Sequence, residues 1–245
     1  MEFEGKTALI TGGAVRLGRS IARHLAGRGV NIVIHYRSSA GPAEALRDEL
    51  RGLGVTSTLV KGDLVSEAAC VEAIRDAYAG AGGLDILVNN AAVFHKDRLA
   101  DVTEANVMSE FWPNLFAPLF LIRSFAARAE SGRIVNMLDR RIVSDDVECV
   151  PYLLSKKGLY ALTRLAALEL APRFTVNGVA PGVLLPPPGK DDAYMRQHGG
   201  VVPLNYQCTP EDIADAVVYL VESDAITGQV IYIDGGKHLL GTEHG

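Results

Sequence analysis

Short apolar segments alternate with helix-like segments along almost the whole chain, and this alternation constrains the fold more than any other feature. The apolar segments lack the in-and-out pattern of a half-exposed strand, so each is expected to be buried on both faces of a sheet. Strands separated by helices are joined as parallel βαβ units with right-handed crossovers. The sequence therefore predicts an α/β fold: a single-domain, doubly wound (Rossmann-type) parallel sheet flanked by helices, spanning residues 1–245. The expected strands are 6–11, 30–36, 57–63, 85–91, 132–138, 174–182 and 229–234.

The expected helices start at residues that favour helix N-termini. Ser66 is placed to cap the third helix, and Thr209 with the proline that follows it opens the last one. The segment 104–129 is predicted to be one long helix, in which a bend would fall near Pro113 and Pro118. The expected helices are 17–29, 42–54, 67–78, 104–129 and 152–170, with a further one after Thr209.

The composition excludes several classes of protein. The chain has 245 residues, of which 48% are hydrophobic, and this is enough to bury the core of one domain. Its net charge of −5 argues against a nucleic-acid-binding surface, which is normally basic. The start of the chain does not resemble a signal peptide, and no apolar run approaches the length of a membrane span. No nucleic-acid or membrane partner is expected.

The cysteines and histidines indicate reduced thiols and no bound metal. The three cysteines, Cys70, Cys149 and Cys208, are far apart and form no C-x-x-C pair, which is typical of a cytoplasmic protein. The six histidines are dispersed, without the spacing of tetrahedral metal ligands. The sequence therefore predicts a cytoplasmic protein without a metal site.

A glycine-rich turn lies between the first expected strand and the first expected helix. Gly12, Gly13 and Gly18 leave the backbone uncovered there, as required if a pyrophosphate is to pack on the N-terminus of the helix. Such a turn is weak evidence alone, but its position after a strand and before a helix indicates a dinucleotide site. In doubly wound sheets that site lies at the carboxyl ends of the strands.

The end of the second strand indicates which dinucleotide binds. NAD enzymes usually carry an acidic residue there for the ribose 2′-hydroxyl, and the segment "HYRSS" (35–39) has none. It offers Arg37 with the Ser38 and Ser39 hydroxyls instead, and Arg16 lies in the glycine turn. A guanidinium matches a 2′-phosphate in charge and geometry, so these residues favour NADP(H). The alternative is that Arg37 is only a solvated surface residue.

Several ordered motifs together resemble the short-chain dehydrogenase/reductase family. They are Thr11-Gly12 with Gly18, Asp63-Leu64, Asn89-Asn90-Ala91, Asn114, Tyr152-x-x-x-Lys156 and Pro181-Gly182. The resemblance implies that Asp63 binds the adenine amino group, that the segment around Asn90 lines the cofactor, and that Pro181-Gly182 approaches the nicotinamide. The expected cofactor-binding residues are Thr11, Gly12, Gly13, Arg16, Leu17, Gly18, Tyr36, Arg37, Ser38, Asp63, Leu64, Asn90, Ala91, Tyr152, Lys156, Pro181 and Gly182.

Tyr152 and Lys156 lie one helical turn apart, so both face the same side of their helix. A nearby ammonium favours the phenolate, so Lys156 is expected to lower the pKa of Tyr152. The family resemblance makes Tyr152 the proton donor as hydride reaches the substrate. It further implies that Lys156 holds the nicotinamide ribose and that Asn114 supports a proton-relay water.

Asp139 stands where this family usually carries a catalytic serine. One interpretation is an inactive homologue, and another is that Asp139 pairs with Arg140 or Arg141 on the surface. The intact Tyr152, Lys156 and Asn114 argue against inactivity. As a direct acid near neutral pH, Asp139 would need a raised pKa, so a shared Tyr152–Asp139–water system with coupled titration is expected instead.

A narrower resemblance, to pteridine reductases, accounts for this substitution. In that branch an aspartate replaces the serine, an arginine occupies the glycine turn, and an aromatic residue after the N-N-A motif stacks on the pterin. The corresponding residues here are Arg16, Phe94, Asp139 and Tyr152, which are the expected substrate-binding residues. Reduction of a C=N bond needs hydride at carbon and a proton at nitrogen, and a carboxyl group can hydrogen-bond a pterin ring. A ring held against Phe94 would gain stacking energy.

Some residues depart from the pteridine reductase pattern. Ala92 stands where many members have a serine that contacts the ligand, and Cys149 replaces what is often an aromatic residue. The segment 184–200 has no clear counterpart and is expected to cover the substrate. These departures bear on the choice of substrate more than on the type of reaction.

The sequence therefore predicts an NADPH-dependent reductase of a pterin-type substrate, with Asp139, Tyr152, Lys156 and Asn114 as the catalytic residues. Two alternatives remain open. One is a carbonyl reductase of the 3-oxoacyl type, and the other is a non-catalytic, NADP(H)-binding regulatory protein on the same fold. The family resemblance also implies a homotetramer packed through the long helices.

Overall fold

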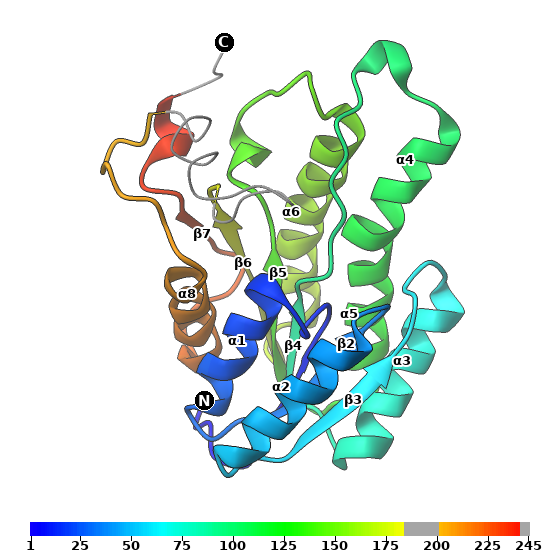
Figure 1. The fold of residues 1–245 in the computed structure, drawn as a ribbon, viewed down its shortest axis with the longest axis vertical. Helices are drawn as coiled ribbons and strands as arrows, with labels where there is room; N and C mark the ends of the chain where they lie inside the picture. Colours follow the sequence, from blue (N-terminus) through cyan, green and yellow to red (C-terminus); the bar gives the residue numbers. More distant parts are fainter. Residues whose placement is uncertain (184–200, 241–245) are drawn as a thin grey trace.

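The computed structural model describes residues 1–183 and 201–240, which form one parallel sheet with helices on both faces (Figure 1). The sheet has seven strands in the order β3-β2-β1-β4-β5-β6-β7, and every neighbouring pair is parallel. The order runs outward from β1 to β3 and then resumes on the other side of β1 with β4, which confirms the predicted doubly wound fold. The strands are β1 (Thr7–Ile10), β2 (Asn31–Tyr36), β3 (Ser57–Lys61), β4 (Ile86–Asn89), β5 (Gly132–Met137), β6 (Phe174–Pro181) and β7 (Val230–Ile233).

Helices connect the strands at the positions expected from the sequence. The α-helices are α1 (Arg16–Ala26), α2 (Ala40–Gly52), α3 (Glu67–Ala81), α4 (Glu104–Phe111), α5 (Ala117–Ala126), α6 (Val150–Leu170) and α8 (Pro210–Glu222). Shorter helical turns are η1 (Leu99–Asp101), η2 (Trp112–Phe116), η3 (Arg140–Val143) and η4 (Lys237–Leu240). The expected substrate cover at 184–200 lies outside the described residues.

Two predicted helix caps are confirmed. The Ser66 side chain accepts a hydrogen bond from the backbone N–H of Ala69 at 3.2 Å. Thr209 forms a capping box with Asp212, whose backbone N–H donates to the Thr209 hydroxyl at 3.3 Å. Each cap satisfies a backbone donor that the first turn of a helix leaves without an intrahelical partner.

The long helix expected over 104–129 is interrupted by a π-helical turn, η2, instead of following one α-helical path. In this turn the backbone N–H of Ala117 bonds the carbonyl oxygen of Trp112, five residues earlier. Pro113 is the second residue of this turn, and Pro118 is the second residue of α5. Proline has no N–H to donate, so the regular α-helical ladder cannot pass through these positions unchanged.

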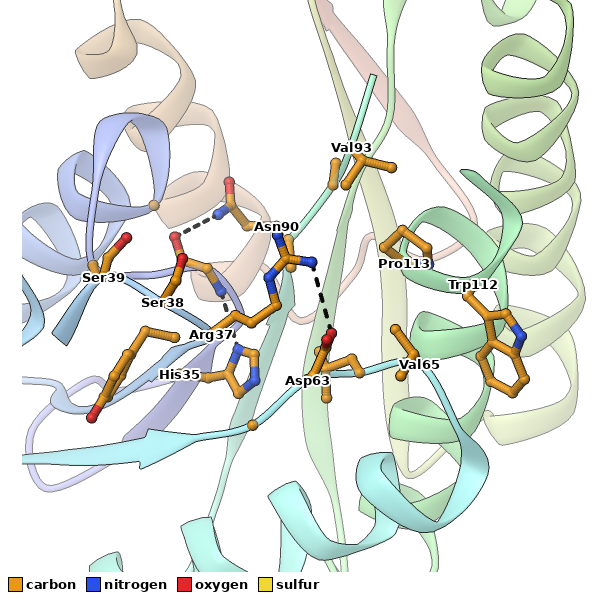
Figure 2. A pocket seen from close by; sticks show the side chains of 18 of the residues that line it. His35, Arg37, Ser38, Ser39, Asp63, Val65, Asn90, Val93, Trp112 and Pro113 are labelled. Carbon is orange, nitrogen blue, oxygen red and sulfur yellow. Dashed lines mark hydrogen bonds and ion pairs between the residues drawn. The ribbon is translucent and has the colours of Figure 1, made fainter. Parts of the chain in front are cut away.

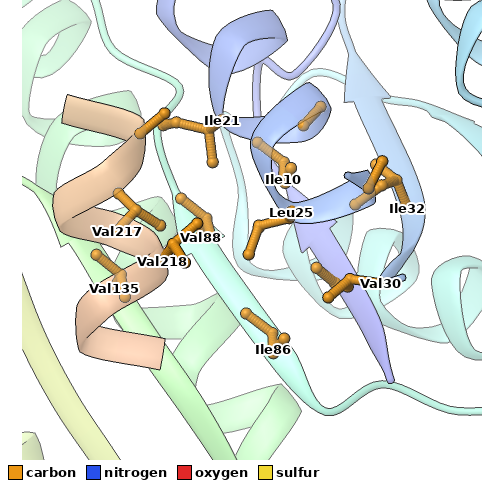
Figure 3. Close-up of a cluster of buried hydrophobic side chains, with 14 of the residues drawn as sticks. Ile10, Ile21, Leu25, Val30, Ile32, Ile86, Val88, Val135, Val217 and Val218 are labelled. Carbon is orange, nitrogen blue, oxygen red and sulfur yellow. The ribbon is translucent and has the colours of Figure 1, made fainter. Parts of the chain in front are cut away.

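Two apolar layers hold the helices against the sheet. Helices α1, α2 and α8 cover one face, and α3, α5 and α6 cover the other. In the first layer, Ile21 of α1 and Val217 of α8 pack over Val88 of β4, and all three side chains are fully buried (Figure 3). Each such side chain contributes about 1.5–3 kcal/mol through burial. Because the layers fix the strands, they also fix the strand ends where the polar residues gather.

Two further features are missing from residues 1–183 and 201–240. No helix in this part of the chain is long and apolar enough to cross a membrane. Nor does it hold a group of three or more histidine, cysteine, aspartate or glutamate side chains arranged to bind a metal ion.

Candidate active site

The glycine turn after β1 is closely packed and could not accept side chains. A Cβ atom on Gly18 would lie 2.3 Å from the carbonyl oxygen of Gly12, and one on Gly13 would lie 2.9 Å from that of Ile10. Gly12 also adopts a positive φ of 61°, which favours glycine. The turn therefore keeps its backbone close to whatever binds at the start of α1.

The N-terminus of α1 is suited to an anion. Its N-cap, Val15, supplies no side-chain hydrogen bond, and the first turn contains no acidic residue. The N–H groups of such a turn point toward the ligand side, and the helix dipole favours negative charge there. This uncapped end and the bare glycine turn together fit the pyrophosphate of a dinucleotide.

Asn90, just after β4, ties the turn to the neighbouring strand end. Its side-chain amide donates to the carbonyl oxygens of Thr11, at 2.8 Å, and Gly12, at 3.2 Å. The Thr11 hydroxyl in turn accepts the backbone N–H groups of Asn90 and Ala91, both at 2.9 Å. Thr11 thus acts by holding the turn, while Asn90 presents part of its surface to the cavity beside it.

A cavity of about 960 Å³ lies beyond the carboxyl ends of β1, β2 and β4 (Figure 2). The predicted cofactor residues on its wall are Gly12, Arg16, Leu17, Gly18, Tyr36, Arg37, Ser38, Asp63, Leu64, Asn90 and Ala91. Its volume suits a large ligand. The described wall of this cavity does not include the remaining predicted residues Thr11, Gly13, Tyr152, Lys156, Pro181 and Gly182.

Arg37 extends across the cavity toward Asp63 (Figure 2). The closest atoms, Nη1 of Arg37 and Oδ1 of Asp63, are 3.9 Å apart, and the Arg37 side chain is 63% exposed. So loose and solvated an ion pair contributes little and leaves the guanidinium able to turn toward an anionic ligand. Ser38 is also on the wall. Arg16 has a positive φ of 50°, unusual for a residue with a side chain.

His35 is a cavity residue that the sequence analysis did not identify. It is buried in β2, and its Nδ1 accepts the backbone N–H of Gly12 at 3.4 Å. Burial lowers the pKa of His35 to about 4, so the ring is neutral at ordinary pH and can accept this hydrogen bond. The sequence signal that could have identified His35 is its polar ring directly after the apolar run Ile32–Ile34.

Pro181 and Gly182 lie at the end of β6, beside β7. The backbone N–H of Gly182 donates to the carbonyl oxygen of Ile233 at 2.9 Å. A Cβ atom on Gly182 would lie 2.9 Å from the Cα of Asp234, so this close approach of two backbones requires glycine.

Tyr152 and Lys156 project from α6 to the end of β5, where both side chains are buried. The Tyr152 hydroxyl donates to Oδ2 of Asp139 at 2.9 Å. The Lys156 ammonium donates to the carbonyl oxygen of Met137 at 2.8 Å and lies 5.9 Å from the centre of the Tyr152 ring. Burial lowers the pKa of Lys156 to about 8, against the opposing charge of Asp139. The three predicted catalytic side chains are thus brought together.

The expected lowering of the Tyr152 pKa is not found. Burial of the hydroxyl, followed by the charge of the Asp139 carboxylate, raises the pKa of Tyr152 well above its ordinary value. The Lys156 ammonium instead donates to the carbonyl oxygen of Met137. Tyr152 is therefore held as a neutral hydroxyl that donates its proton toward Asp139.

The neighbouring Arg141 stabilises the ionised form of the Asp139 carboxyl group. Nε and Nη2 of Arg141 donate to the two carboxylate oxygens at 3.0 and 2.9 Å, and the backbone N–H of Arg141 adds a bond at 2.9 Å. Burial of Asp139 opposes its ionisation, but the bonds and charge of Arg141 outweigh it and hold the pKa of Asp139 below its ordinary value. The raised pKa that a direct acid would need is therefore absent. Pairing with Arg141 is observed, although it is largely buried instead of on the surface.

Arg141 is a central site residue that the sequence analysis named only as a surface partner. Its guanidinium carbon lies 5.2 Å from the centre of the Phe94 ring and 5.3 Å from that of Tyr152. The two rings meet edge to face, with centres 4.8 Å apart. Arg141 also donates to Asp146 at 3.0 Å and contacts the sulfur of Cys149 at 3.4 Å. It therefore joins the predicted aromatic wall to the predicted acid.

Asn114 is fully buried in η2 and connects three segments. Its Oδ1 accepts the backbone N–H of Val93, and its Nδ2 donates to the Val93 carbonyl oxygen, both at 3.0 Å. Nδ2 also contacts Oγ of Ser155, on α6, at 3.2 Å and Oε2 of Glu110 at 2.8 Å. The side chain thus braces the segment after β4 against the helix that carries Tyr152.

The comparison with protein families agrees with this arrangement. A family model described as enoyl-(acyl carrier protein) reductase matches residues 13–238. The chain belongs to the short-chain dehydrogenase/reductase family. The resemblance inferred from the ordered motifs is confirmed.

Curated relatives of this short-chain dehydrogenase/reductase cover nearly its whole length. The 3-oxoacyl-[acyl-carrier-protein] reductase FabG of Staphylococcus epidermidis is 31% identical over 242 residues, covering 96% of this chain and 99% of the relative. The uncharacterized oxidoreductase YhdF of Bacillus subtilis is 31% identical over 246 residues, covering 97% of this chain and 85% of the relative.

Solved relatives share its fold closely. FolM alternative dihydrofolate reductase 1 from Brucella canis, complexed with NADP, has a TM-score of 0.90 at 31% identity, covering 98% of this chain and 96% of that chain. FolM alternative dihydrofolate reductase 1 from Brucella suis, also in complex with NADP, has a TM-score of 0.87 at 31% identity, with coverage of 96% and 95%. NADP is the dinucleotide that the sequence predicts for this chain.

Proposed function

We propose that this protein is an NADPH-dependent reductase of a pterin-type substrate, such as a dihydropteridine or a dihydrofolate-like molecule. One observation carries the proposal: Asp139 stands at the serine position as a carboxylate, ionised by Arg141 and hydrogen-bonded by Tyr152. The FolM structures named above, alternative dihydrofolate reductases, support it independently.

A carboxylate at this position suits a pterin better than a ketone. An ionised carboxylate only accepts hydrogen bonds, and a pterin offers donors through its amino group and ring N–H. A ketone offers only an oxygen that gains negative charge as it is reduced, and a neighbouring carboxylate would disfavour that charge. Once the Tyr152 hydroxyl turns toward the substrate, Oδ2 of Asp139 would accept a hydrogen bond from the edge of the pterin and orient its reacting bond.

The proton for the ring nitrogen is assigned to Tyr152. Its raised pKa keeps the hydroxyl protonated, and its bond to Asp139 holds the phenol oxygen in place until the O–H group turns toward the bound substrate. NADPH, when bound, supplies the hydride to the substrate carbon. Lys156 would hold the nicotinamide ribose and place a positive charge near Tyr152 as the proton leaves. Asp139 then acts by orienting Tyr152 and the substrate, without itself donating a proton.

The cofactor would lie along the cavity beyond β1, β2 and β4. Gly12, Gly13 and Gly18 with the start of α1 would receive the pyrophosphate, and Arg37 with Ser38 and Arg16 would meet the 2′-phosphate. The wall residues Leu17, Tyr36, Asp63, Leu64, Asn90 and Ala91 would surround the adenosine and ribose, with Thr11 behind them. Pro181 and Gly182, at the end of β6, would approach the nicotinamide.

A second candidate is a 3-oxoacyl reductase, which the similarity to FabG of Staphylococcus epidermidis favours. The two candidate reactions share the hydride donor and Tyr152. They differ in the substrate group that would lie beside Asp139. A carbonyl substrate would have to place its oxygen near Tyr152 while avoiding the carboxylate. The pterin proposal is preferred because it gives the carboxylate a function.

The test is a panel of NADPH oxidation assays with purified protein. Dihydrobiopterin, dihydromonapterin, dihydrofolate and an acetoacetyl thioester are compared at equal concentration, and product formation is verified by mass spectrometry. Efficient turnover of at least one dihydropterin, with little of the thioester, is expected. Turnover of the thioester alone would support the second candidate. Tight NADPH binding without turnover of any substrate would indicate a regulatory homologue.

A homotetramer packed through α4 to α6 is proposed as well. Large apolar side chains are exposed on these helices: Leu165 is 64% exposed and Leu168 is 81% exposed on α6, and Leu119 is 37% exposed on α5. Burial against another copy would remove this apolar surface from water. Light scattering after size exclusion measures the mass directly, and a monomeric mass at micromolar concentration would contradict the proposal.

A further inference from the structure

Phe94 forms one wall of the proposed substrate site, yet packing alone does not hold it there. The residue is 45% exposed, and its described ring neighbours are Tyr152, 4.8 Å away, and the guanidinium of Arg141, 5.2 Å away. A half-exposed ring on a connecting segment has few contacts to fix its position. The position of the wall must therefore be set by its backbone.

The backbone on both sides of Phe94 is hydrogen-bonded to one helical segment, the end of α4 and η2. Before it, Asn114 bonds the N–H and the carbonyl oxygen of Val93, both at 3.0 Å. After it, Oε1 of Glu110 accepts the backbone N–H of His95 at 2.7 Å and lies 2.7 Å from Nδ1 of the same residue. Phe94 is thus held between two clamped neighbours.

Burying the Glu110 carboxylate costs free energy, and its hydrogen bonds must offset that cost. Its side chain is only 1% exposed, and burial raises the pKa of Glu110 above its ordinary value despite the bonds from His95, which lower it. Buried carboxylates are costly unless they are fully hydrogen-bonded. Both of its oxygens are used, since Oε2 accepts from Asn114 at 2.8 Å. Within the residues that the structure describes, all hydrogen bonds of the Glu110 side chain go to the clamp around Phe94.

The clamp is also joined to the helix that carries the proton donor. Asn114 contacts Oγ of Ser155 at 3.2 Å, and Ser155 lies between Tyr152 and Lys156 on α6. This bond sets the distance between the clamp and α6, so loss of the Glu110 bonds would let the Phe94 ring move relative to the Tyr152 ring. The place of the Phe94 ring would decide whether a flat ring can stack on it within reach of the Tyr152 hydroxyl.

We propose that Glu110 is a positioning residue that, through His95 and Asn114, sets the place of Phe94 and so selects flat heteroaromatic substrates. The inference rests on the proposed function for its substrate class. It assigns no contact between Glu110 and the substrate. The described side chains that the carboxylate contacts are His95 from the segment after β4 and Asn114 from η2, and it exerts a charge effect on Lys156 of α6.

The test compares Glu110→Ala and Glu110→Gln with a control on the same helix, Glu104→Gln, whose side chain is exposed. Hydrogen exchange of the segment 93–95 reports the clamp without any need for activity. In Glu110→Ala its exchange should quicken, while exchange in β4 and β5 stays slow. Glutamine keeps one acceptor for the His95 N–H, so Glu110→Gln should recover much of the protection. The control should resemble the wild type.

Kinetic measurements distinguish a positioning role of Glu110 from a general loss of structure in its variants. Glu110→Ala should raise the KM for a dihydropterin on the order of tenfold or more, as small misplacements near reacting groups do. Val93 and His95 also line the cofactor cavity, but Glu110 is absent from its described wall, so the Kd for NADPH, measured by fluorescence, should rise by much less than the pterin KM. Glu110→Gln should restore most of the KM.

Three results would count against the inference. Unchanged exchange at 93–95 in Glu110→Ala would overturn the clamp, and faster exchange with an unchanged pterin KM would overturn the selection of substrate. Equal losses in pterin KM and NADPH affinity would indicate general damage, which also overturns it. If the wild type itself reduces no dihydropterin, the proposed function fails, and the pterin part of the inference fails with it. Failure confined to the Glu110 variants overturns only the positioning role.

Discussion

The two ends of the site are built in different ways. At the cofactor end, the surface proposed for the pyrophosphate is mainly backbone: a turn of glycines that no side chain could enter and an uncapped helix N-terminus. At the chemical end, the surface is a buried network of charged and aromatic side chains around Arg141. The first kind of site depends on local conformation, and the second depends on which distant side chains meet. Damage to one end should therefore leave the other largely intact.

Tyr152→Phe should give the largest effect on turnover. The substitution removes the only hydroxyl hydrogen-bonded to Asp139 in the described site and leaves the ring against Phe94. Loss of a positioned proton donor costs about 10²–10⁴-fold in rate, while NADPH should bind almost as before. Steady-state kinetics and a fluorescence titration of NADPH measure the two ends separately. Loss of NADPH binding in this variant would show that the ends are not independent.

Arg141→Met should destabilise the chemical end. It leaves the Asp139 carboxylate buried without its partner, and breaking such a pair costs roughly 3–5 kcal/mol in free energy of unfolding. Urea denaturation measures the loss. The double variant Arg141→Met with Asp139→Asn removes both charges and should recover much of the stability. If the double variant is no more stable than Arg141→Met, the pairing is not the cause.

Arg37→Ala tests the cofactor end. Its side chain is 63% exposed and only loosely paired, so the expected effect is moderate. Loss of a charge-assisted bond to the 2′-phosphate should reduce the preference for NADPH over NADH by about tenfold, allowing for solvent screening. The ratio of the two kcat/KM values measures this preference, and kcat with saturating NADPH should change little. A wild type without any preference for NADPH would contradict the assignment.

The pH dependence of kcat/KM should give the smallest effect and would sharpen the account of the chemical end. Burial lowers the pKa of Lys156 to about 8, so the free enzyme loses this positive charge as the pH rises through that value. The raised pKa of Tyr152 keeps its proton at this pH, and the lowered pKa of Asp139 places its titration in the acid range, below 3.8. The profile should therefore be flat from about pH 5 to 7 and fall above about pH 8. An acid limb near neutral pH would instead indicate that Asp139 works as a protonated acid.

The fold and the cofactor end could be predicted because their signals are local. Buried strands, helix caps such as Ser66 and Thr209, and the glycines before α1 each act within a few residues of the chain. Even there, His35 was missed, because its role comes from a hydrogen bond to Gly12, in the turn that follows the neighbouring strand β1. The π turn at Pro113 was predicted only as a place for a bend.

The sequence by itself determined the doubly wound sheet, the glycine turn, and the presence of Tyr152, Lys156 and Asp139 at the ends of neighbouring elements. Periodicity and spacing are sufficient for these features, since backbone geometry follows from them directly. Only the tertiary structure decided that Asp139 is an anion, that Tyr152 keeps its proton, and that Glu110 clamps the segment around Phe94. The physical reason is that a charge state or a ring position is set by groups within a few ångströms, and folding brings those groups together from distant parts of the chain.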